Sequence, residues 1–296
     1  MNLKNAYRNG TERLRASGVP EPELDAWYLL EYVTGIDRAS YYADPDREMT
    51  ESRKAEYDRC IEARSRRIPL QHITGEQEFM GLTFHVNSDV LIPRQDTETL
   101  VETALDLLNC GKSTNRTEER IVRLLDMCTG SGCILLSMLH YAKCRTEGIG
   151  SDISAKALNV ASENARRLGM TAGFIESDLF EKIEGKFTMI LSNPPYIRSA
   201  EIAGLQDEVR LYDPAGALDG KEDGLYFYRK IIRQSREYLE PGGYLMLEIG
   251  WDQAEEVSAL MRASGYAGIR VKKDLAGLDR VVSGVYSGRV LSKEKR

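Results

Sequence analysis

The sequence predicts an α/β protein whose main part is a doubly wound, mostly parallel β-sheet preceded by a small helical bundle. From residue 121 to residue 286, short apolar runs typical of buried strands alternate with longer segments of helical periodicity. This order of elements builds a parallel sheet with helices on both faces. Residues 1–75 show only helical periodicity, so we expect them to form a separate unit.

Length and composition are those of a globular protein with one large and one smaller domain. The chain has 296 residues, of which 42% are hydrophobic and 29% are charged. No apolar run is long enough to span a bilayer, and the first residues lack the pattern of a secretory signal, so we expect a cytoplasmic protein. The net charge of −6 disfavours stable binding to nucleic acid, which depends on Lys and Arg neutralising phosphates.

The cysteines and histidines do not indicate a metal site. The five cysteines form no C-x-x-C pair and the three histidines are scattered, whereas zinc sites group such ligands at short spacings. An odd, unpatterned set of cysteines fits reduced thiols in a reducing compartment.

Residues 1–75 are expected to contain amphipathic helices. In the segment from 21 to 33, the periodicity places Tyr28 on the buried side and Asp25 among the polar residues. A later helix begins after Thr50, a candidate N-cap. Three arginines end that helix, and we interpret them as a solvated helix end, with a binding patch as the alternative. They are Arg64, Arg66 and Arg67.

Residues 76–95 are expected to form a β-hairpin linker. Apolar residues alternate from Phe79 to Val86 and return at Val90–Ile92, and Asn87-Ser88-Asp89 between them has the composition of a turn. A helix is expected from about 96 to 108, so the large domain is assigned to residues 96–296. The polar run 111–120 is expected to be a loop.

The first three strands of the large domain end in residues that suit a nucleotide. The strand 121–125 leads into a glycine-containing turn, Asp126–Cys133, whose backbone can approach a ligand closely. A tight turn without a ligand is the alternative. Asp152 closes the second strand, where a carboxylate can accept both hydroxyls of a ribose. Asp178 follows the third strand and can accept from an adenine amino group while Leu179 packs on the ring; a helix cap is the alternative.

The fourth strand, 187–192, ends abruptly in Asn193-Pro194-Pro195-Tyr196. Neither proline can donate a hydrogen bond to a sheet. The Asn193 amide oxygen and the proline carbonyls can accept from a planar –NH2 group, and Tyr196 adds a flat ring. An ordinary strand-ending turn is the alternative. Further strands are expected near 243–249, 268–272 and 280–286, with helices over 223–239 and 252–263.

The order of these motifs resembles the class I methyltransferases that use S-adenosylmethionine to methylate a planar nitrogen. Longer stretches narrow the match to the peptide chain release factor N5-glutamine methyltransferase family (PrmC/HemK), over nearly the whole chain. These stretches are Pro69–Gly75, Phe79–Leu82, Val90–Glu98, motifs between Tyr212 and Leu225, and Leu247–Gly250.

This resemblance implies a fold, an activity and a set of site residues. The fold is a seven-stranded Rossmann-like methyltransferase sheet. The activity is methylation, with S-adenosylmethionine, of the glutamine side-chain amide in the Gly-Gly-Gln motif of class I release factors, which residues 1–75 would dock. The implied catalytic residues are Asn193, Pro194 and Tyr196, which with Pro195 also hold the substrate. The implied cofactor contacts are Cys128, Thr129, Gly130, Ser131, Gly132, Asp152, Asp178, Leu179 and Asn193. No metal is implied.

The chain departs from the family pattern at three positions. Cys128 stands where the family has its first loop glycine, and Gln95 stands where proline is usual. Leu179 replaces an aromatic residue often found beside the adenine, which would lose stacking and keep apolar contact. The roles of Arg94 and Glu98 stay open between a structural ion pair and a substrate contact.

Three other functions share part of this pattern. They are methylation of a ribosomal protein glutamine, methylation of an adenine amino group in nucleic acid, and non-catalytic cofactor binding with docking through residues 1–75. The acidic net charge disfavours a nucleic acid substrate. An intact Asn193-Pro194-Pro195-Tyr196 disfavours the non-catalytic module, which has no need of an amide clamp.

Overall fold

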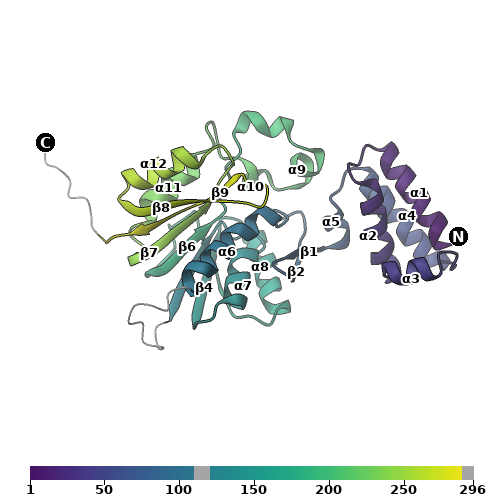
Figure 1. Cartoon of the computed structure of the whole chain (residues 1–296), viewed down its shortest axis with the longest axis horizontal. Coiled ribbons are helices and arrows are strands. Elements are labelled where there is room, and N and C mark those ends of the chain that lie inside the picture. The colour runs from purple at the N-terminus through teal and green to yellow at the C-terminus, as the bar shows by residue number, and fades with distance from the viewer. Residues whose placement is uncertain (110–120, 289–296) are drawn as a thin grey trace. The chain divides into compact units, whose positions relative to one another are not determined.

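The structure is a computed structural model that describes residues 1–109 and 121–288, and the chain divides into two compact units (Figure 1). The first unit comprises Met1–Glu76 together with Leu205–Tyr212, and the second comprises the remainder. The polar run 111–120, predicted to be a loop, lies outside the described residues.

The first unit is a bundle of helices. Apolar side chains of its longer helices form the core, among them Leu14, Leu30 and Tyr57. Gly10 is required where the first helix meets Tyr57, because a Cβ at Gly10 would lie 2.2 Å from the tyrosine hydroxyl oxygen. The helices are α1 (Leu3–Ala16), α2 (Pro22–Thr34), α3 (Arg38–Ala43), α4 (Glu51–Ser65), α5 (Leu70–Thr74) and α9 (Asp207–Tyr212). Thr50 caps α4 as predicted, with its hydroxyl accepting from the Arg53 N–H.

Two side chains of α2 lie opposite to the prediction. Tyr28 is 44% exposed, whereas Asp25 is buried and accepts a hydrogen bond from the Arg64 guanidinium at 2.6 Å. The prediction failed because a carboxylate can be buried at low cost once a guanidinium pairs with it, and helical periodicity contains no information about that partner.

The interpretation of the arginine cluster as a solvated helix end is wrong for two of its members. Arg64 is 5% exposed, and both Arg64 and Arg67 donate to the Glu208 carboxylate of α9, at 2.8 and 2.5 Å. Arg66 alone is solvated, with a side chain 68% exposed. Glu208 comes from a segment far along the chain, so the local sequence of α4 could not predict this pairing.

The predicted hairpin is present, but its turn lies earlier. Strands β1 (Glu76–Phe79) and β2 (Leu82–His85) pair as a two-stranded sheet. Met80 and Gly81 connect them with φ of +52° and +70°, the left-handed conformations that match the twist of a tight hairpin. The stretch Val90–Ile92 is not a strand, and Val90 is buried without pairing into a sheet.

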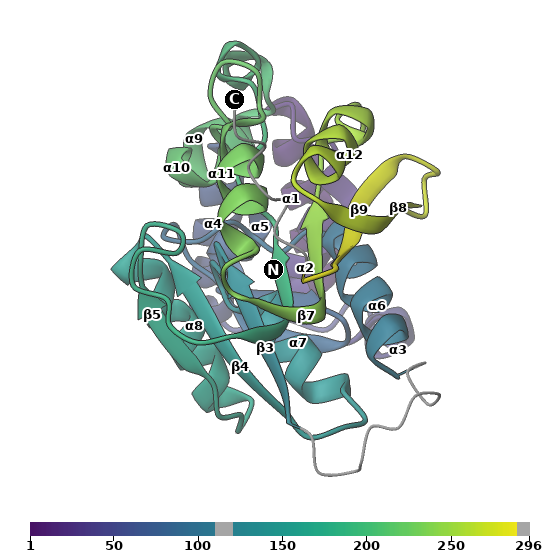
Figure 2. The ribbon, with the colours of Figure 1, turned by 90° about the vertical axis from the view of Figure 1, so that its left-hand side faces the viewer.

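The second unit contains the predicted seven-stranded sheet, in the order β5-β4-β3-β6-β7-β9-β8 (Figure 2). Strands β3 to β7 are parallel, and β9 runs antiparallel to both of its neighbours. The chain order reverses beside β3, and open α/β sheets bind ligands at the carboxyl ends of the strands at such a point. The strands are β3 (Val122–Met127), β4 (Thr146–Asp152), β5 (Gly173–Glu176), β6 (Phe187–Ser192), β7 (Leu239–Glu248), β8 (Tyr266–Lys273) and β9 (Asp279–Tyr286).

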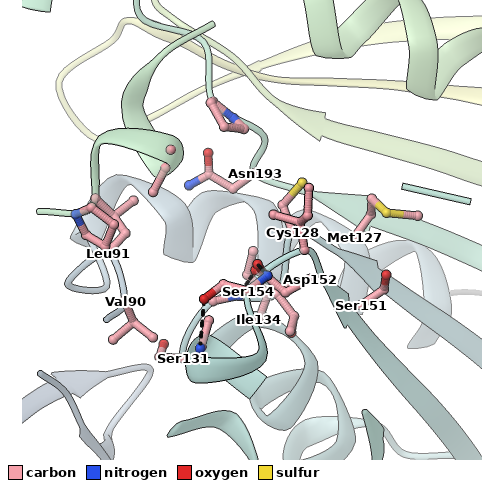
Figure 3. A pocket seen from close by; sticks show the side chains of 18 of the residues that line it. Val90, Leu91, Met127, Cys128, Ser131, Ile134, Ser151, Asp152, Ser154 and Asn193 are labelled. Carbon is pink, nitrogen blue, oxygen red and sulfur yellow. Dashed lines mark hydrogen bonds between the residues drawn. The ribbon is translucent and has the colours of Figure 1, made fainter. Parts of the chain in front are cut away.

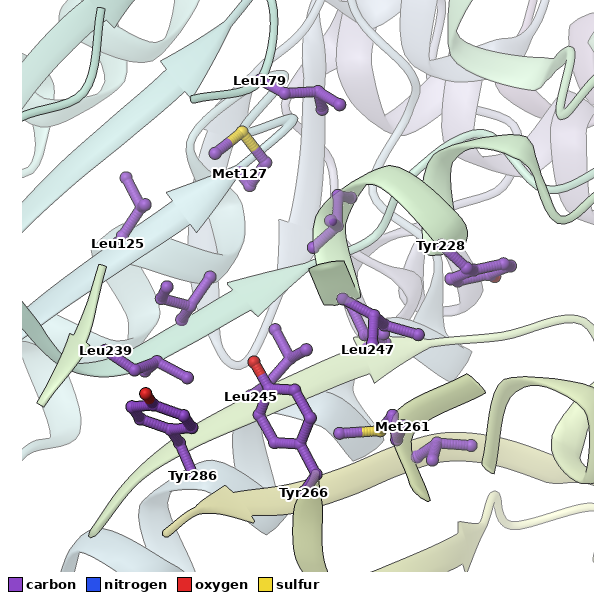
Figure 4. Close-up of a cluster of buried hydrophobic side chains, with 14 of the residues drawn as sticks. Leu125, Met127, Leu179, Tyr228, Leu239, Leu245, Leu247, Met261, Tyr266 and Tyr286 are labelled. Carbon is purple, nitrogen blue, oxygen red and sulfur yellow. The ribbon is translucent and has the colours of Figure 1, made fainter. Parts of the chain in front are cut away.

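Helices and short turns complete the second unit. One buried cluster joins the middle strands to two helices through Leu125, Tyr228, Leu245 and Met261 (Figure 4). The longer helices are α6 (Gln95–Asn109), α7 (Cys133–Tyr141), α8 (Ala155–Arg167), α11 (Tyr226–Ser235) and α12 (Ala254–Ala263). The stretch between β6 and α11 adds η1 (Ser199–Gly204) and α10 (Ala215–Leu218), where only a long loop was predicted. Among the described helices, none is long and apolar enough to cross a membrane.

Candidate active site

A cavity of about 340 Å³ lies at the carboxyl ends of the central parallel strands, within the second unit (Figure 3). Most of the predicted site residues line it. They are Cys128, Thr129, Gly130, Ser131, Asp152, Asp178, Leu179, Asn193 and Pro195. The other three, Gly132, Pro194 and Tyr196, are not among its lining residues.

The turn after β3 is shaped by three residues with positive φ. Gly130 and Gly132 have φ of +53° and +80°. A Cβ at Gly132 would lie 3.2 Å from the Cβ of Ala161 on α8, so this glycine lets the turn pack closely against that helix. Cys128 has φ of +61°, a conformation that costs a residue with a side chain about 1 kcal/mol. The family pattern has glycine at this position, and glycine is the residue that adopts this left-handed backbone conformation without steric cost.

The Asp152 carboxylate is held by the backbone at the edge of the cavity. Oδ2 accepts from the Gly130 N–H at 3.0 Å and Oδ1 accepts from the Ser154 N–H at 2.9 Å. Burial raises the pKa of Asp152, and these two N–H groups act in the opposite direction. Each oxygen keeps a lone pair for a further donor, so the carboxylate is oriented to accept two neighbouring hydroxyls, as a ribose presents them.

A second carboxylate, Asp126, supports the turn from behind. Its Oδ2 accepts from the Thr129 hydroxyl at 2.5 Å and from the Leu135 N–H at 3.3 Å. Burial raises the pKa of Asp126 to about 7. Asp126 does not line the cavity, so its role is to connect the turn to the start of α7.

Asp178 and Leu179 are the residues predicted to contact the adenine. Both line the cavity, and Leu179 belongs to the same buried cluster as Met127. The residues after Asp178 form turns and no helix, which removes the helix cap as an explanation for Asp178. The Ser177 hydroxyl fixes this loop by donating to the Leu179 carbonyl at 2.8 Å and accepting from the Lys182 N–H at 3.0 Å.

Asn193 lies across the cavity from the glycine turn, at the end of β6 (Figure 3). Its Nδ2 donates to the Thr97 hydroxyl at 3.3 Å. The preceding residue, Ser192, donates to the Met127 carbonyl at 2.7 Å, which ties the end of β6 to the end of β3. The side-chain amide of Asn193 is therefore on rigid backbone in the same cavity as Asp152.

Tyr196 packs against the buried cluster of the sheet. Its carbonyl accepts from the Gln253 side chain at 3.1 Å, and burial raises the pKa of its phenol to about 12. Gly220 passes so close that a Cβ there would lie 2.7 Å from the Tyr196 Cα. The contacts of Tyr196 in the structure thus tie the segment after β6 to the sheet, and its contact with a substrate stays a prediction.

Arg94 and Glu98 do not pair with each other. Arg94 donates to the Asp213 carboxylate at 2.5 Å, and Glu98 accepts from the Met80 N–H at 2.6 Å. Burial raises the pKa of Asp213 to about 6, against the opposing effect of Arg94. Arg94 also lines the cavity, so its guanidinium is both half of an ion pair and part of the site.

Two residues near Asn193 were absent from the predicted site. Thr97, in the first turn of α6, lines the cavity, and Glu248, the last residue of β7, is buried behind it. Both lie in stretches that resemble the family. Their proximity arises only when α6 and β7 meet in the fold.

The fold and this site define a class of enzyme, the S-adenosylmethionine-dependent methyltransferases. Residues 112–207 match the family model for the methyltransferase small domain, and residues 5–75 match that for the PrmC N-terminal domain. The hMettl16 catalytic domain has the same fold, with a TM-score of 0.53 at 13% identity over 80% of this chain and 82% of that one. The cofactor is S-adenosylmethionine, and the glycine turn and Asp152 fit its nucleoside.

Whole-length relatives then identify the family. The chain is 41% identical over 274 residues to the release factor glutamine methyltransferase of Agrobacterium fabrum, covering 92% of this chain and 93% of the relative. It is 42% identical over 269 residues to that of Clostridium acetobutylicum, covering 89% and 91%. The chain belongs to the release factor glutamine methyltransferase family.

Proposed function

We propose that this protein methylates the side-chain amide nitrogen of the glutamine in the Gly-Gly-Gln motif of class I peptide chain release factors. The observation that carries the proposal is the presence of Asn193 in the same cavity as Asp152, which puts an amide-recognising group beside the nucleoside cradle. Relatives at about 40% identity over most of their length are named release factor glutamine methyltransferases, and this supports the choice of substrate.

The cofactor is held by the carboxyl ends of β3 to β5 in this proposal. Asp152 accepts the two ribose hydroxyls, Asp178 accepts the adenine amino group, and Leu179 packs on the adenine ring. Cys128, Thr129, Gly130, Ser131 and Gly132 form the turn that faces the nucleoside. Bound S-adenosylmethionine supplies an electrophilic methyl group on its sulfonium.

Asn193 and Pro194 orient the substrate. An amide nitrogen is a poor nucleophile because its lone pair is delocalised into the carbonyl. The Asn193 side-chain oxygen and the Pro194 carbonyl accept its two N–H groups, which aligns the nitrogen and favours the positive charge that develops on it. Pro195 lines the cavity beside them, and Tyr196 supports the segment. The enzyme's contribution is mainly orientation.

The remaining parts of the chain have proposed roles in binding the partner. Residues 1–75 dock the release factor, residues 76–95 link the two domains, and residues 96–296 carry out methyl transfer in the cytoplasm. We propose neither a metal ion nor stable binding to nucleic acid. The described residues contain no group of three or more side chains able to hold a metal ion.

The substitution Asn193→Ala tests the role of the amide. It removes one of two acceptors for the substrate N–H groups, so methyl transfer should fall by about 100-fold or more. Calorimetry should show cofactor affinity within a few-fold of wild type, since the ribose and adenine contacts lie elsewhere. Asn159→Ala, at an exposed position of α8, is the matched control and should keep full activity. Full turnover by the Asn193 variant contradicts the assignment.

A further inference from the structure

Arg94 is a charged side chain of the cavity that the proposed function does not use. It lines the cavity, its side chain is 41% exposed, and it immediately precedes helix α6 (Gln95–Asn109). A cation at the N-terminus of a helix interacts unfavourably with the helix dipole, so the charge of Arg94 does not stabilise α6. Its position therefore points to a task other than helix stability.

The Arg94 guanidinium is anchored at one end and open to the cavity. Its Nη2 donates to the Asp213 carboxylate at 2.5 Å, and the Asp213 side chain is fully buried. This bond uses one of the five N–H groups of a guanidinium. Because Arg94 also lines the cavity, its other N–H groups can reach a ligand there, in the planar fork that matches a carboxylate.

The strand order indicates which part of the cofactor reaches Arg94. The sheet runs β5-β4-β3-β6, and the proposed adenine and ribose contacts, Asp178 and Asp152, lie at the ends of β5 and β4. The rest of the cofactor then extends past the turn after β3 toward Asn193, at the end of β6. The Arg94 carbonyl accepts from the Thr97 N–H at 3.0 Å, and the Thr97 hydroxyl accepts from the Asn193 Nδ2 at 3.3 Å. Arg94 therefore belongs to the end of the cavity that receives the methionine half.

The charges of the cofactor select the group that Arg94 binds. The methionine half has one carboxylate, and its ammonium and sulfonium groups are both cations. The charged side chains that line the cavity are the acids Asp89, Asp152 and Asp178 and the cations Arg94 and Lys221. A carboxylate that leaves water needs a cation or several hydrogen-bond donors, so one of these two cations is expected to bind it.

Lys221 suits this task less well than Arg94. Its Nζ lies 2.9 Å from the carboxylate of Asp219, two residues earlier in the chain, and its side chain is 52% exposed. An ammonium acts as a point charge and leaves the orientation of a carboxylate free, whereas a guanidinium binds both carboxylate oxygens in one plane.

We propose that Arg94 binds the carboxylate of the methionine half of S-adenosylmethionine, with Asp213 holding the guanidinium in place. This inference rests on the proposed placement of the nucleoside by Asp152 and Asp178. Both ends of the cofactor are then held by the protein, which fixes the methyl group between them relative to Asn193.

Isothermal calorimetry with two ligands tests the inference without turnover. Decarboxylated S-adenosylmethionine lacks only the carboxylate of the cofactor. Wild type should bind it about 10- to 100-fold more weakly than S-adenosylmethionine, the loss expected for a hydrogen bond between charged groups. Arg94→Met keeps an unbranched side chain without N–H donors, and its two Kd values should agree within about 3-fold. A difference that persists undiminished in Arg94→Met overturns the inference.

Two lysine variants control for charge alone. Lys156 lies 3.5 Å from the Asp89 carboxylate but does not line the cavity. Lys156→Met should keep the wild-type difference between the two ligands, which separates a direct contact from a long-range effect of charge. Lys221→Met should also keep it. Loss of the difference in Lys221→Met, with the difference retained in Arg94→Met, would assign the carboxylate to Lys221 and overturn the inference.

A nucleoside ligand and a second variant control for damage to the cavity. The affinity for 5′-methylthioadenosine, which has no amino-acid part, should be the same in wild type and Arg94→Met. If Arg94→Met does not fold because Asp213 is left buried without its partner, the double variant Arg94→Met/Asp213→Asn removes both charges. It should show the same loss of discrimination between the two ligands, and a retained difference would overturn the inference.

Steady-state kinetics separate a cofactor contact from a substrate contact. If Arg94 contacted the release factor, Arg94→Met would raise the KM for the release factor and leave the Kd for S-adenosylmethionine unchanged, and this result would overturn the inference. The calorimetry contains no release factor, so it does not depend on which substrate is methylated. Loss of discrimination in Arg94→Met, in an enzyme that leaves release factors unmodified, would reject the proposed function alone.

Discussion

Replacement of Asp152 by asparagine gives the most direct measure of the proposed cofactor cradle. The carboxylate is fixed by the Gly130 and Ser154 N–H groups at 3.0 and 2.9 Å, so its free lone pairs are aimed into the cavity before any ligand binds. Asparagine keeps the size of the side chain but removes the charge. The asparagine –NH2 group would also face the N–H of either Gly130 or Ser154, and that N–H would then lose its hydrogen-bond acceptor.

The expected loss follows from the hydrogen bonds removed. A hydrogen bond to a charged group contributes about 1.5–3 kcal/mol, and two ribose hydroxyls are involved. We expect about 2–4 kcal/mol, which raises the Kd for S-adenosylmethionine by roughly 30- to 1000-fold. Isothermal calorimetry measures this directly. Glu176→Gln is the matched control, since Glu176 pairs in register with Asp152 on β5 and is exposed. Equal affinity of Asp152→Asn and wild type would refute the ribose role.

Two further predictions concern the first unit. Burial acts to raise the pKa of Glu208, but hydrogen bonds from Arg67 and Arg64 outweigh it and lower the pKa to about 2. Because the folded-state pKa lies below its usual value of 4.5, this ion pair stabilises the fold above pH 4.5, and the stabilisation is lost as the pH falls toward 2. Glu208→Gln should lower the free energy of unfolding at pH 7 by about 3 kcal/mol and weaken its dependence on pH below 4.5, as followed by circular dichroism; an unchanged acid transition contradicts this. Gly10→Ala should lower the free energy of unfolding by about 2 kcal/mol, because the added methyl group overlaps Tyr57. Thermal unfolding measures this loss, and a Tm equal to that of wild type contradicts the prediction.

The features predicted correctly from the sequence are those encoded within one segment. Each strand of the sheet is a short apolar run, and a glycine turn or a proline pair marks its end. The strand ends at Gly130, Asp152 and Asn193 could therefore be ordered along the chain, and parallel pairing then brings them to one edge of the sheet. This is why the cavity contains most of the predicted site residues.

The features that were missed depend on contacts between distant segments. Asp25 and Arg64 are buried because each pairs with the other, and Glu208 joins them from a segment that looked like loop. The hairpin turn was misplaced because Asn87-Ser88-Asp89 has stronger turn composition than Met80-Gly81. Periodicity describes one segment at a time, so it cannot predict such pairings.

The site shows the same limit. Thr97 is in the first turn of a helix, and nothing in that segment indicates that its hydroxyl accepts a hydrogen bond from Asn193. Tyr196 packs against the sheet core, and its contact with the substrate stays a prediction.

Mass spectrometry of the methylated product tests the central claim most directly. The purified protein is incubated with isotopically labelled S-adenosylmethionine and, separately, a class I release factor, a ribosomal protein or DNA. We predict one labelled methyl group on the side-chain nitrogen of the Gly-Gly-Gln glutamine, and labelling slower by about 100-fold or more with Asn193→Ala. Label on a ribosomal protein glutamine or an adenine, with the release factor unmodified, would contradict the proposed function.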